Sequence, residues 1–197
     1  MANNTYAFGL APIGGVNNAG HGGIRAYYVP SSYATDLFIG DMVTSTTTLN
    51  ATEINGHKAG SLKTVVRYAA GDTAVTGVIV GFEPINEYTP IGEQGKASTE
   101  RVVYVMDDPN ATFTVRADGD ATAEIVGKNV DVTVNAGSVV TGCSGIIVDS
   151  SSANTSATLP LKVIGIAQEE NEDAVGASMK LIVSLNTSTL APHTAGI

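Results

Sequence analysis

The stretches TVVRYAAGDTAVTGVIVGFEPINEY (residues 64–88) and ERVVYVMDDPNATFTVRAD (residues 100–118) decide the fold class. They hold three apolar runs, at 65–66, 75–82 and 102–105, which are rich in β-branched and aromatic residues. The turn formers Ala-Gly-Asp, Glu-Pro and Asp-Asp-Pro bound these runs. Short apolar runs of this composition between such turns are typical of strands buried on at least one face. The two stretches therefore predict a mostly β protein.

The rest of the chain continues this pattern. We expect further strands at 25–29, 111–119, 130–134, 138–149, 159–168 and 178–186. Asn55-Gly56 is the strongest short hairpin signal, because both residues tolerate the left-handed backbone of a two-residue turn. The run at 65–68 is expected to pair with the strand that follows it, and residues 120–128 are the only predicted helix, with Asp120 as N-cap. Together these elements predict a β-sandwich or a small β-barrel.

Three regions divide the chain. Residues 1–24 are rich in Gly and Asn and predict an extended arm that becomes ordered against something else, with a frayed terminus as the alternative. We expect the large apolar side chains of the arm to make its contacts: Tyr6, Phe8, Leu10 and Ile13. Residues 25–116 predict a β module, and residues 117–197 predict either a second β module or a continuation of the same domain.

Two segments of the chain resemble each other. VIVGFEPINE (78–87) and VIGIAQEENE (163–172) share an apolar strand, a Gly and a polar crossover containing Asn-Glu. In both cases a basic residue then opens another apolar strand. Duplication of a β module explains this echo, and so does one kind of hairpin used twice.

The composition narrows the range of partners. The chain has 10 Lys and Arg against 19 Asp and Glu, a net charge of −9, so phosphates would repel it and we expect no nucleic-acid partner. No apolar run approaches the ~18 residues of a membrane span, and the N-terminal segment does not resemble a signal peptide. The single cysteine, Cys143, excludes an intramolecular disulfide and is expected to be a small buried residue in a strand.

No catalytic or metal-binding constellation is predicted, and no cofactor. Asp107 and Asp108 are adjacent, so on a strand they point to opposite faces, and the Pro-Asn that follows indicates a turn. The acidic run 169–173 has no calcium-binding spacing. The histidines lie far apart in the sequence, at His21, His57 and His193.

Five stretches carry a resemblance to a known family. They are GLAPIGG (9–15), RAYYVPSSYATDLFIGDMV (25–43), AAGDTAVTGVIVGFEP (69–84), ERVVYVMDDPNATFTVRADG (100–119) and LPLKVIGIAQEENEDAVGASMKLIVSLN (159–186). The chain resembles the capsid decoration, or cement, proteins of tailed bacteriophages. The resemblance implies a non-enzymatic structural protein of the virion, on the outer surface of an icosahedral capsid. It also implies that the protein bridges subunits of the major capsid protein, as a dimer or a trimer.

Two other functions are open to this sequence. One is a receptor- or glycan-binding β domain of a phage fibre or other surface appendage, with Tyr33, Tyr88 and Asn86 as its binding residues, although the absence of Trp argues against it. The other is an acid-type glycosidase, for which the candidate carboxylates are Glu83, Asp107 and Asp108.

Overall fold

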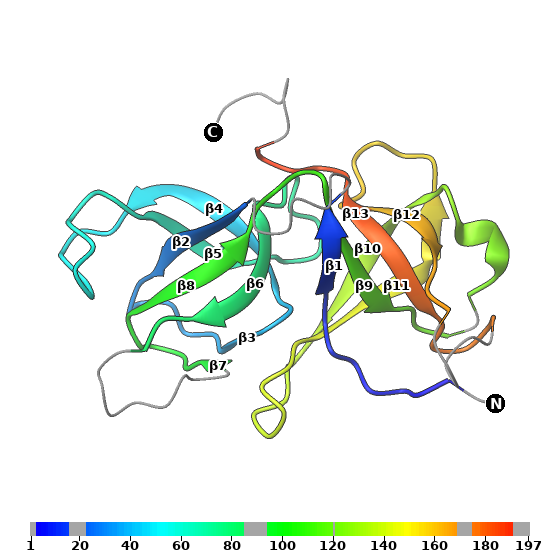
Figure 1. Cartoon of the computed structure of the whole chain (residues 1–197), viewed down its shortest axis with the longest axis horizontal. Coiled ribbons are helices and arrows are strands. Elements are labelled where there is room, and N and C mark those ends of the chain that lie inside the picture. Colours follow the sequence, from blue (N-terminus) through cyan, green and yellow to red (C-terminus); the bar gives the residue numbers. More distant parts are fainter. Residues whose placement is uncertain (1–2, 16–22, 85–93, 120, 169–174, 191–197) are drawn as a thin grey trace.

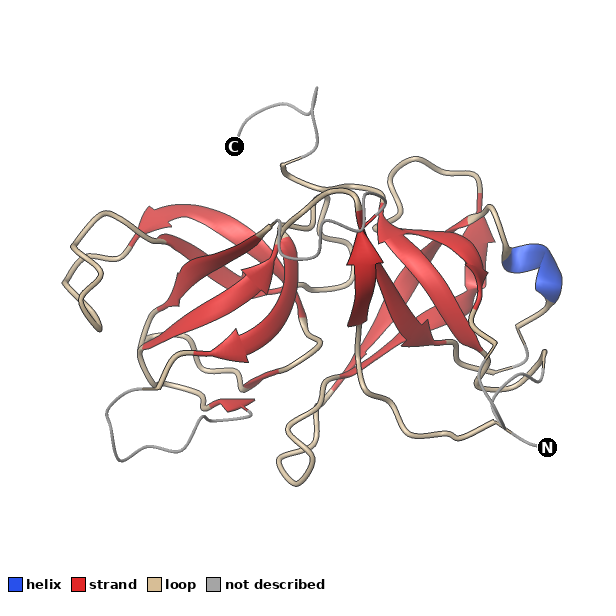
Figure 2. Ribbon diagram, viewed as in Figure 1, coloured by secondary structure: helices blue, strands red, loops and turns tan. Residues whose placement is uncertain are grey.

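The computed structural model describes residues 3–15, 23–84, 94–119, 121–168 and 175–190. Their regular elements are all strands apart from a single 3-10 turn at Ala123–Ile125 (Figure 2), so the predicted mostly β fold is confirmed. Two β bodies lie side by side (Figure 1).

The first body is a closed five-stranded barrel in the order β2-β5-β4-β6-β8. Its strands are β2 (Ile24–Val29), β4 (Met42–Leu49), β5 (Lys63–Arg67), β6 (Gly77–Phe82) and β8 (Arg101–Met106). Neighbours are antiparallel except β2 and β5, which pair in parallel at Tyr28 and Thr64. The short strands β3 (Leu37–Phe38) and β7 (Gln94–Gly95) pair beside this barrel.

The second body has its strands in the order β9-β13-β12-β10-β11. They are β9 (Ala111–Arg116), β10 (Asn129–Asn135), β11 (Gly145–Asn154), β12 (Leu161–Ile166) and β13 (Lys180–Leu185). A parallel bridge between Ala117 and Val148 brings β11 back beside the end of β9, so this sheet also closes into a barrel. Strand β1 (Ala11–Gly15) comes from the arm and pairs antiparallel with β9.

The two barrels have the same topology. In each barrel, the strand that comes first in the sequence pairs antiparallel with the strand that comes last. Three further antiparallel pairs and one parallel contact complete the closed ring of five strands. The equivalent strands are therefore β2 and β9, β4 and β10, β5 and β11, β6 and β12, and β8 and β13.

Backbone hydrogen bonds repeat residue by residue between the barrels. In the first, Gly40 N–H donates to the Ile79 carbonyl and Ile79 N–H donates to the Asp41 carbonyl, both at 2.9 Å. The second barrel has the same exchange, also at 2.9 Å, among Gly127, Val163 and Lys128. The pairing register also shifts at equivalent places, between Ile79 and Gly81 and between Val163 and Gly165. These shifts lie in the VIVG and VIGI segments, so the repeat spans a whole barrel and is not limited to one hairpin.

The boundary between the modules differs from the predicted 116/117. Strand β9 pairs with β13, so it belongs to the second barrel, and the chain changes barrels in the turn at 107–110. The arm also ends differently, because β1 joins the second barrel whereas Ile24 already begins β2 of the first.

Three local predictions are corrected. Strand β5 pairs with β4 and β2 and not with the following β6, because β4 lies between β5 and β6. The strand predicted at 138–149 begins only at Gly145 and runs on to Asn154, since residues 138–143 form a turn closed by Ser138 N–H and the Cys143 carbonyl at 2.9 Å. In the region predicted as helix, the described residues form only the turn Ala123–Ile125, and Gly127 follows with a φ of +86°. Asn55 and Gly56 do form the predicted tight turn, with φ of 48° and 81°.

Candidate functional site

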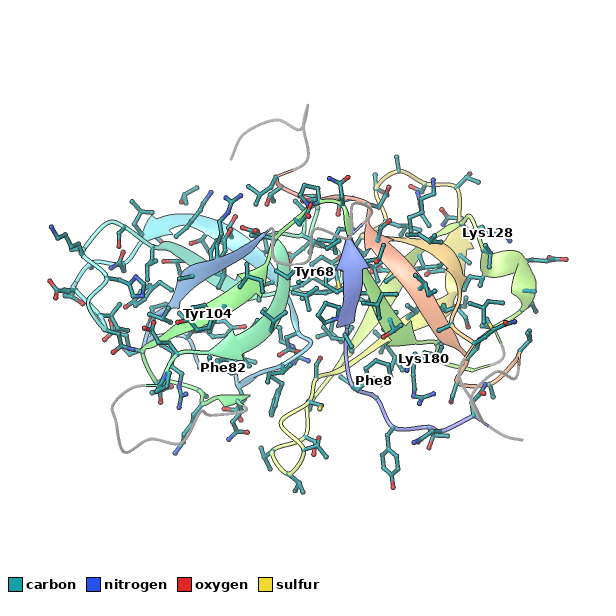
Figure 3. All side chains as sticks on the ribbon, in the orientation of Figure 1. Phe8, Tyr68, Phe82, Tyr104, Lys128 and Lys180 are labelled. Atoms are coloured by element: carbon teal, nitrogen blue, oxygen red, sulfur yellow. The ribbon has the colours of Figure 1, made fainter. Side chains whose placement is uncertain are left out.

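Apolar packing, polar contacts and main-chain pairs connect the two barrels at their junction. The first barrel (β2-β5-β4-β6-β8, called barrel 1) directs apolar side chains outward from β4, β6 and the segments next to them. These side chains join the core that fills the second barrel (β9-β13-β12-β10-β11, called barrel 2). They are Met42, Tyr68, Val75 and Val78, each at most 2% exposed. Figure 3 shows Tyr68 between the two barrels. This shared core joins the two barrels into one body, although the interior of barrel 1 is filled by a separate cluster of its own.

A buried polar cluster crosses the junction. The Asp41 carboxylate is fully buried and accepts hydrogen bonds from Ser144 Oγ at 2.5 Å and Phe38 N–H at 2.9 Å. Arg67 Nε lies 3.2 Å from Asp41 Oδ1, and another nitrogen of the same guanidinium donates to the Asn135 carbonyl. Burial raises the pKa of Asp41, while Arg67 and the hydrogen bonds oppose this. The cluster connects barrel 1 to the β10–β11 hairpin of barrel 2.

Backbone pairing joins the barrels at two further places. Ile39 forms a parallel bridge with Cys143, and Val75 forms one with Ser188. In the second, Val75 N–H donates to the Thr187 carbonyl at 3.0 Å. Main-chain pairs of this kind fix the separation of the barrels as well as their contact.

The arm is held by residues of both barrels. Leu10 is 1% exposed, lies in the shared core, and donates its N–H to the Gly40 carbonyl at 3.0 Å. The Phe8 ring contacts two cations, with Arg116 at 5.5 Å and Lys180 at 5.2 Å from its centroid. Figure 3 labels Phe8 and Lys180. Two of the four predicted contact residues, Leu10 and Phe8, are therefore engaged inside the molecule.

The other two predicted contact residues are exposed. Tyr6 is 80% exposed, although its carbonyl accepts a hydrogen bond from Arg116 Nε at 2.9 Å. Ile13 is 52% exposed on β1. The β10–β11 hairpin adds a further exposed apolar pair that the sequence did not single out, Val139 and Val140, at 66% and 87%.

Two grooves run along the junction. One, of about 440 Å³, is lined by residues that include Asp72, Pro160 and Asn186. The other, of about 590 Å³, includes Tyr33. Tyr68 and Asp131 line both grooves. Burial raises the pKa of Tyr68 to about 12, and the negative charges of Asp131 and Asp72 add to this rise. The Tyr33 hydroxyl accepts the Arg67 N–H at 3.1 Å. Of the proposed glycan-binding residues, Tyr88 and Asn86 lie outside the described residues.

The three candidate carboxylates do not converge. Glu83 N–H donates to the Val102 carbonyl, so Glu83 lies beside Val102. Asp107 follows Val102 by five residues, a distance of about 17 Å along an extended strand at about 3.4 Å per residue. Glycosidase carboxylates lie about 5–9.5 Å apart. Glu83 instead contacts His57 Nε2 at 3.1 Å, and Asp108 accepts the Asn110 N–H at 2.8 Å in the predicted turn.

Asp107 belongs to a second buried polar group. It is fully buried, accepts the Tyr27 hydroxyl at 2.7 Å and lies 3.3 Å from Arg25 Nε. Burial raises the pKa of Asp107, partly opposed by the Tyr27 hydrogen bond and the Arg25 charge. Burial also raises the pKa of Tyr27, and the bond to Asp107 adds to this rise. This group closes one end of the barrel 1 interior.

Cys143 is half-buried in a turn, not in a strand as predicted, and its thiol lies 3.5 Å from the Thr141 carbonyl. His21, His193 and the whole acidic run 169–173 lie outside the described residues. In the described part of the chain, no three His, Cys, Asp or Glu side chains gather to hold a metal ion. Among the same residues, no helix has the length and hydropathy to cross a bilayer.

No sequence motif marks the Asp41 cluster. Its one signal in the sequence is a carboxylate that follows a Gly inside an apolar run, FIGDMV (38–43). In the structure this Gly, Gly40, has a φ of +90°. A charged residue in such a run is buried only with partners, and Arg67 and Ser144 come from distant parts of the chain. Comparisons of this chain with protein-family models, curated proteins and solved structures find no match.

Proposed function

We propose that this protein is a non-enzymatic capsid decoration protein of a tailed bacteriophage. It binds the outer surface of the icosahedral head and stabilises the head by bridging subunits of the major capsid protein. The resemblance carried by the five sequence stretches suggests this function. Association into dimers or trimers is part of the same proposal.

The observation that carries the proposal is the pair of equivalent barrels joined into one body. A capsid presents the same surface again at each neighbouring subunit. A molecule with two similar bodies at a fixed separation suits two such surfaces at once. After the first contact forms, the second is intramolecular, so weak single contacts add up to durable attachment. The shared core and the Asp41 cluster supply the fixed separation.

The exposed apolar residues are the contact candidates. Tyr6 lies on the arm, and Val139 and Val140 lie at the β10–β11 hairpin, which projects from the molecule in Figure 1. None of the three contributes to the core, so their replacement leaves the fold unchanged. That separation makes them suitable for testing attachment apart from stability.

Sedimentation with phage heads tests the proposal. Heads of the encoding phage, prepared without the protein, are mixed with wild-type chain and pelleted. Wild type is expected to pellet with the heads and to raise their resistance to heat and chelators. The Tyr6→Ala/Val140→Ser variant is expected to bind more weakly at unchanged melting temperature, with exposed Val175→Ser as the control. Absence of wild type from the pellet, with heads equally resistant with and without it, would reject the function.

A glycan-binding role is the second candidate. The feature that favours it is the groove of about 590 Å³ beside Tyr33, since sugars stack on tyrosine rings in such grooves. A glycan array is the direct test: reproducible binding that is lost in Tyr33→Ala would support this role, and an array without hits would remove it.

A further inference from the structure

The contact between the barrels joins two unlike surfaces. Barrel 2 contributes its β10–β11 hairpin, whereas barrel 1 contributes the segment just before β4. In that segment Ile39 N–H donates to the Gly142 carbonyl at 3.2 Å, and the Ile39 carbonyl accepts the Ser144 N–H at 2.8 Å. Ser144 Oγ also donates to Asp41. Because the barrels are equivalent, a heterologous contact of this kind leaves each barrel with the half of the contact that it does not use.

The unused half on barrel 2 is the acceptor of a hairpin. Since β10 is the counterpart of β4, Val126 stands where Ile39 stands in barrel 1. Val126 is 42% exposed, and Ile164 of β12, which the backbone pairing places next to it, is 49% exposed. A pocket of about 370 Å³ at the same place is lined by residues that include Ile125 and Lys128. We call Val126, Ile164 and Lys128 the acceptor surface, an accessible apolar pair beside a cation.

The chemistry of this surface defines its occupant. In barrel 1 the carboxylate of Asp41 is matched by a donor of the hairpin, Ser144 Oγ. In barrel 2 the equivalent position holds Lys128, whose ammonium group only donates and therefore requires an acceptor. Val126 N–H already donates to the Ala123 carbonyl at 3.3 Å, so the occupant makes its contact through side chains. The acceptor surface thus fits a hairpin that carries a carboxylate.

The unused half on barrel 1 is such a hairpin. Residues 50–62 connect β4 to β5 and are the counterpart of the β10–β11 hairpin. Their tip is folded onto barrel 1, where Asn55 Nδ2 donates to the Pro84 carbonyl at 3.0 Å. They include a single carboxylate, Glu53, which is exposed.

The hairpin and the acceptor surface lie at opposite ends of the molecule. Figure 1 places the β4–β5 hairpin at the end of barrel 1 away from barrel 2. Figure 2 shows the 3-10 turn at Ala123–Ile125, next to the acceptor surface, at the other end. One chain therefore cannot join these two surfaces to each other, but two copies can.

We propose that copies of this protein associate head to tail, with the β4–β5 hairpin of one copy on the acceptor surface of the next. Glu53 of the hairpin pairs with Lys128 of the next copy. Contacts of this kind close into a ring when the rotation between copies allows it. The inference rests on the proposed function, because such a ring is the dimer or trimer included there. Val139 and Val140 take no part in the contact, so association and head binding can be measured separately.

Charge reversal tests the contact by sedimentation equilibrium. Wild type should form the ring, and Glu53→Lys and Lys128→Glu should each weaken association about tenfold, because like charges replace an ion pair. The double variant Glu53→Lys/Lys128→Glu should associate like wild type. An equal mixture of the two single variants should associate more strongly than either alone, because opposite charges meet wherever unlike chains touch. Lys96→Glu, at an exposed site outside both surfaces, is the control and should not weaken association.

Cross-linking tests the same contact in wild type, so the result does not depend on whether a variant folds. A carbodiimide joins a carboxylate directly to an amine that touches it. It should link Glu53 of one chain to Lys128 of another. Chains that are linked only at other positions would overturn the inference.

Each other outcome is also decisive. Wild type that stays monomeric would overturn the inference, and if it still pellets with heads, the proposed attachment to the capsid stands. Association that neither single variant weakens, or a mixture no stronger than its components, would overturn the inference as well. A wild-type ring that fails to bind heads would reject the proposed function and leave this contact standing.

Discussion

The two barrels share a topology but fill the same three positions with opposite chemistry. Barrel 1 has Arg25, Tyr27 and Asp107 joined by a hydrogen bond of 2.7 Å and an ion pair of 3.3 Å. The pairing register makes their barrel 2 counterparts Phe113, Val115 and Leu185, all buried and apolar. The backbone pairing thus fixes the fold in both barrels, while the side chains at one end are free to differ.

A second difference lies at the junction. The counterpart of the buried Asp41 is Lys128, which is half-buried on barrel 2. In barrel 1 the side chain at this position is hydrogen-bonded to Ser144 of the other barrel, whereas at the equivalent position of barrel 2 Lys128 does not join the barrels in this way. The barrels differ most where one of them makes a contact that the other does not, and this comparison can be tested position by position.

The largest expected effect comes from the apolar end of barrel 2. Phe113→Ala removes a fully buried ring and should lower the free energy of unfolding by about 3–5 kcal/mol. Arg25→Ala, at the equivalent position, should cost less, about 1–2 kcal/mol, because the Arg25 side chain is 63% exposed although its removal leaves the buried Asp107 without its ionic partner. Urea denaturation of both variants measures the difference. Equal losses would show that the two positions are not equivalent in the way described.

A loss of about 3–5 kcal/mol is also expected at the junction. Asp41→Ala leaves Arg67, whose side chain is only 11% exposed, without its ionic partner and the Ser144 hydroxyl without its acceptor. Lys128→Ala, its counterpart, should change stability by no more than about 0.5 kcal/mol. Calorimetry should also show the Asp41→Ala variant melting in two steps, since the link between the barrels is weakened. A single unshifted transition would mean that the cluster does not join them.

A smaller change, in the opposite direction, is expected from making the barrels alike. The triple variant Arg25→Phe/Tyr27→Val/Asp107→Leu gives barrel 1 the apolar group of barrel 2. Replacing a buried ionic group by packed apolar side chains is often neutral or stabilising by about 1–4 kcal/mol, and the lower end of this range applies here because only Asp107 of the ion pair is buried. The melting temperature should therefore stay the same or rise. A variant that fails to fold would show that the polar group is required for barrel 1 to close.

The smallest effect concerns pH. Burial raises the pKa of Asp107 above its usual 3.8, so the folded state binds this proton more tightly than the unfolded state. The contribution of this group is then most favourable below pH 3.8 and is lost as pH rises through the folded-state pKa. Relative to Asp107→Asn, wild type should gain stability between pH 7 and pH 4. A difference between the two that does not vary with pH would contradict the raised pKa.

Much of the fold was predictable because turn formers and β-branched runs act locally. Strands at 101–106 and 111–116 follow from their apolar runs and from the Asp108-Pro109 turn. Which sheet each strand joins was not predictable, because these two consecutive strands lie in different barrels. The echo of VIVG and VIGI was readable because a Gly stands at the equivalent register shift of each barrel, Gly81 in one and Gly165 in the other.

The rest of the repeat left no trace in the sequence, since Arg25 and Phe113 share a position without sharing any chemistry. The junction was hidden for a related reason. Arg67 and Ser144 are unremarkable in their own segments and become partners of Asp41 only after both barrels have formed. For the arm, the apolar residues were identified, but only burial distinguishes Leu10 at 1% from Tyr6 at 80%.

Cryo-electron microscopy of phage heads incubated with the protein tests the central claim most directly. Each bound molecule should appear on the outer surface as two barrel-shaped densities at a fixed separation, with each barrel on a different capsid subunit. Heads with no added density, or molecules attached to a single subunit through one barrel, would contradict the account.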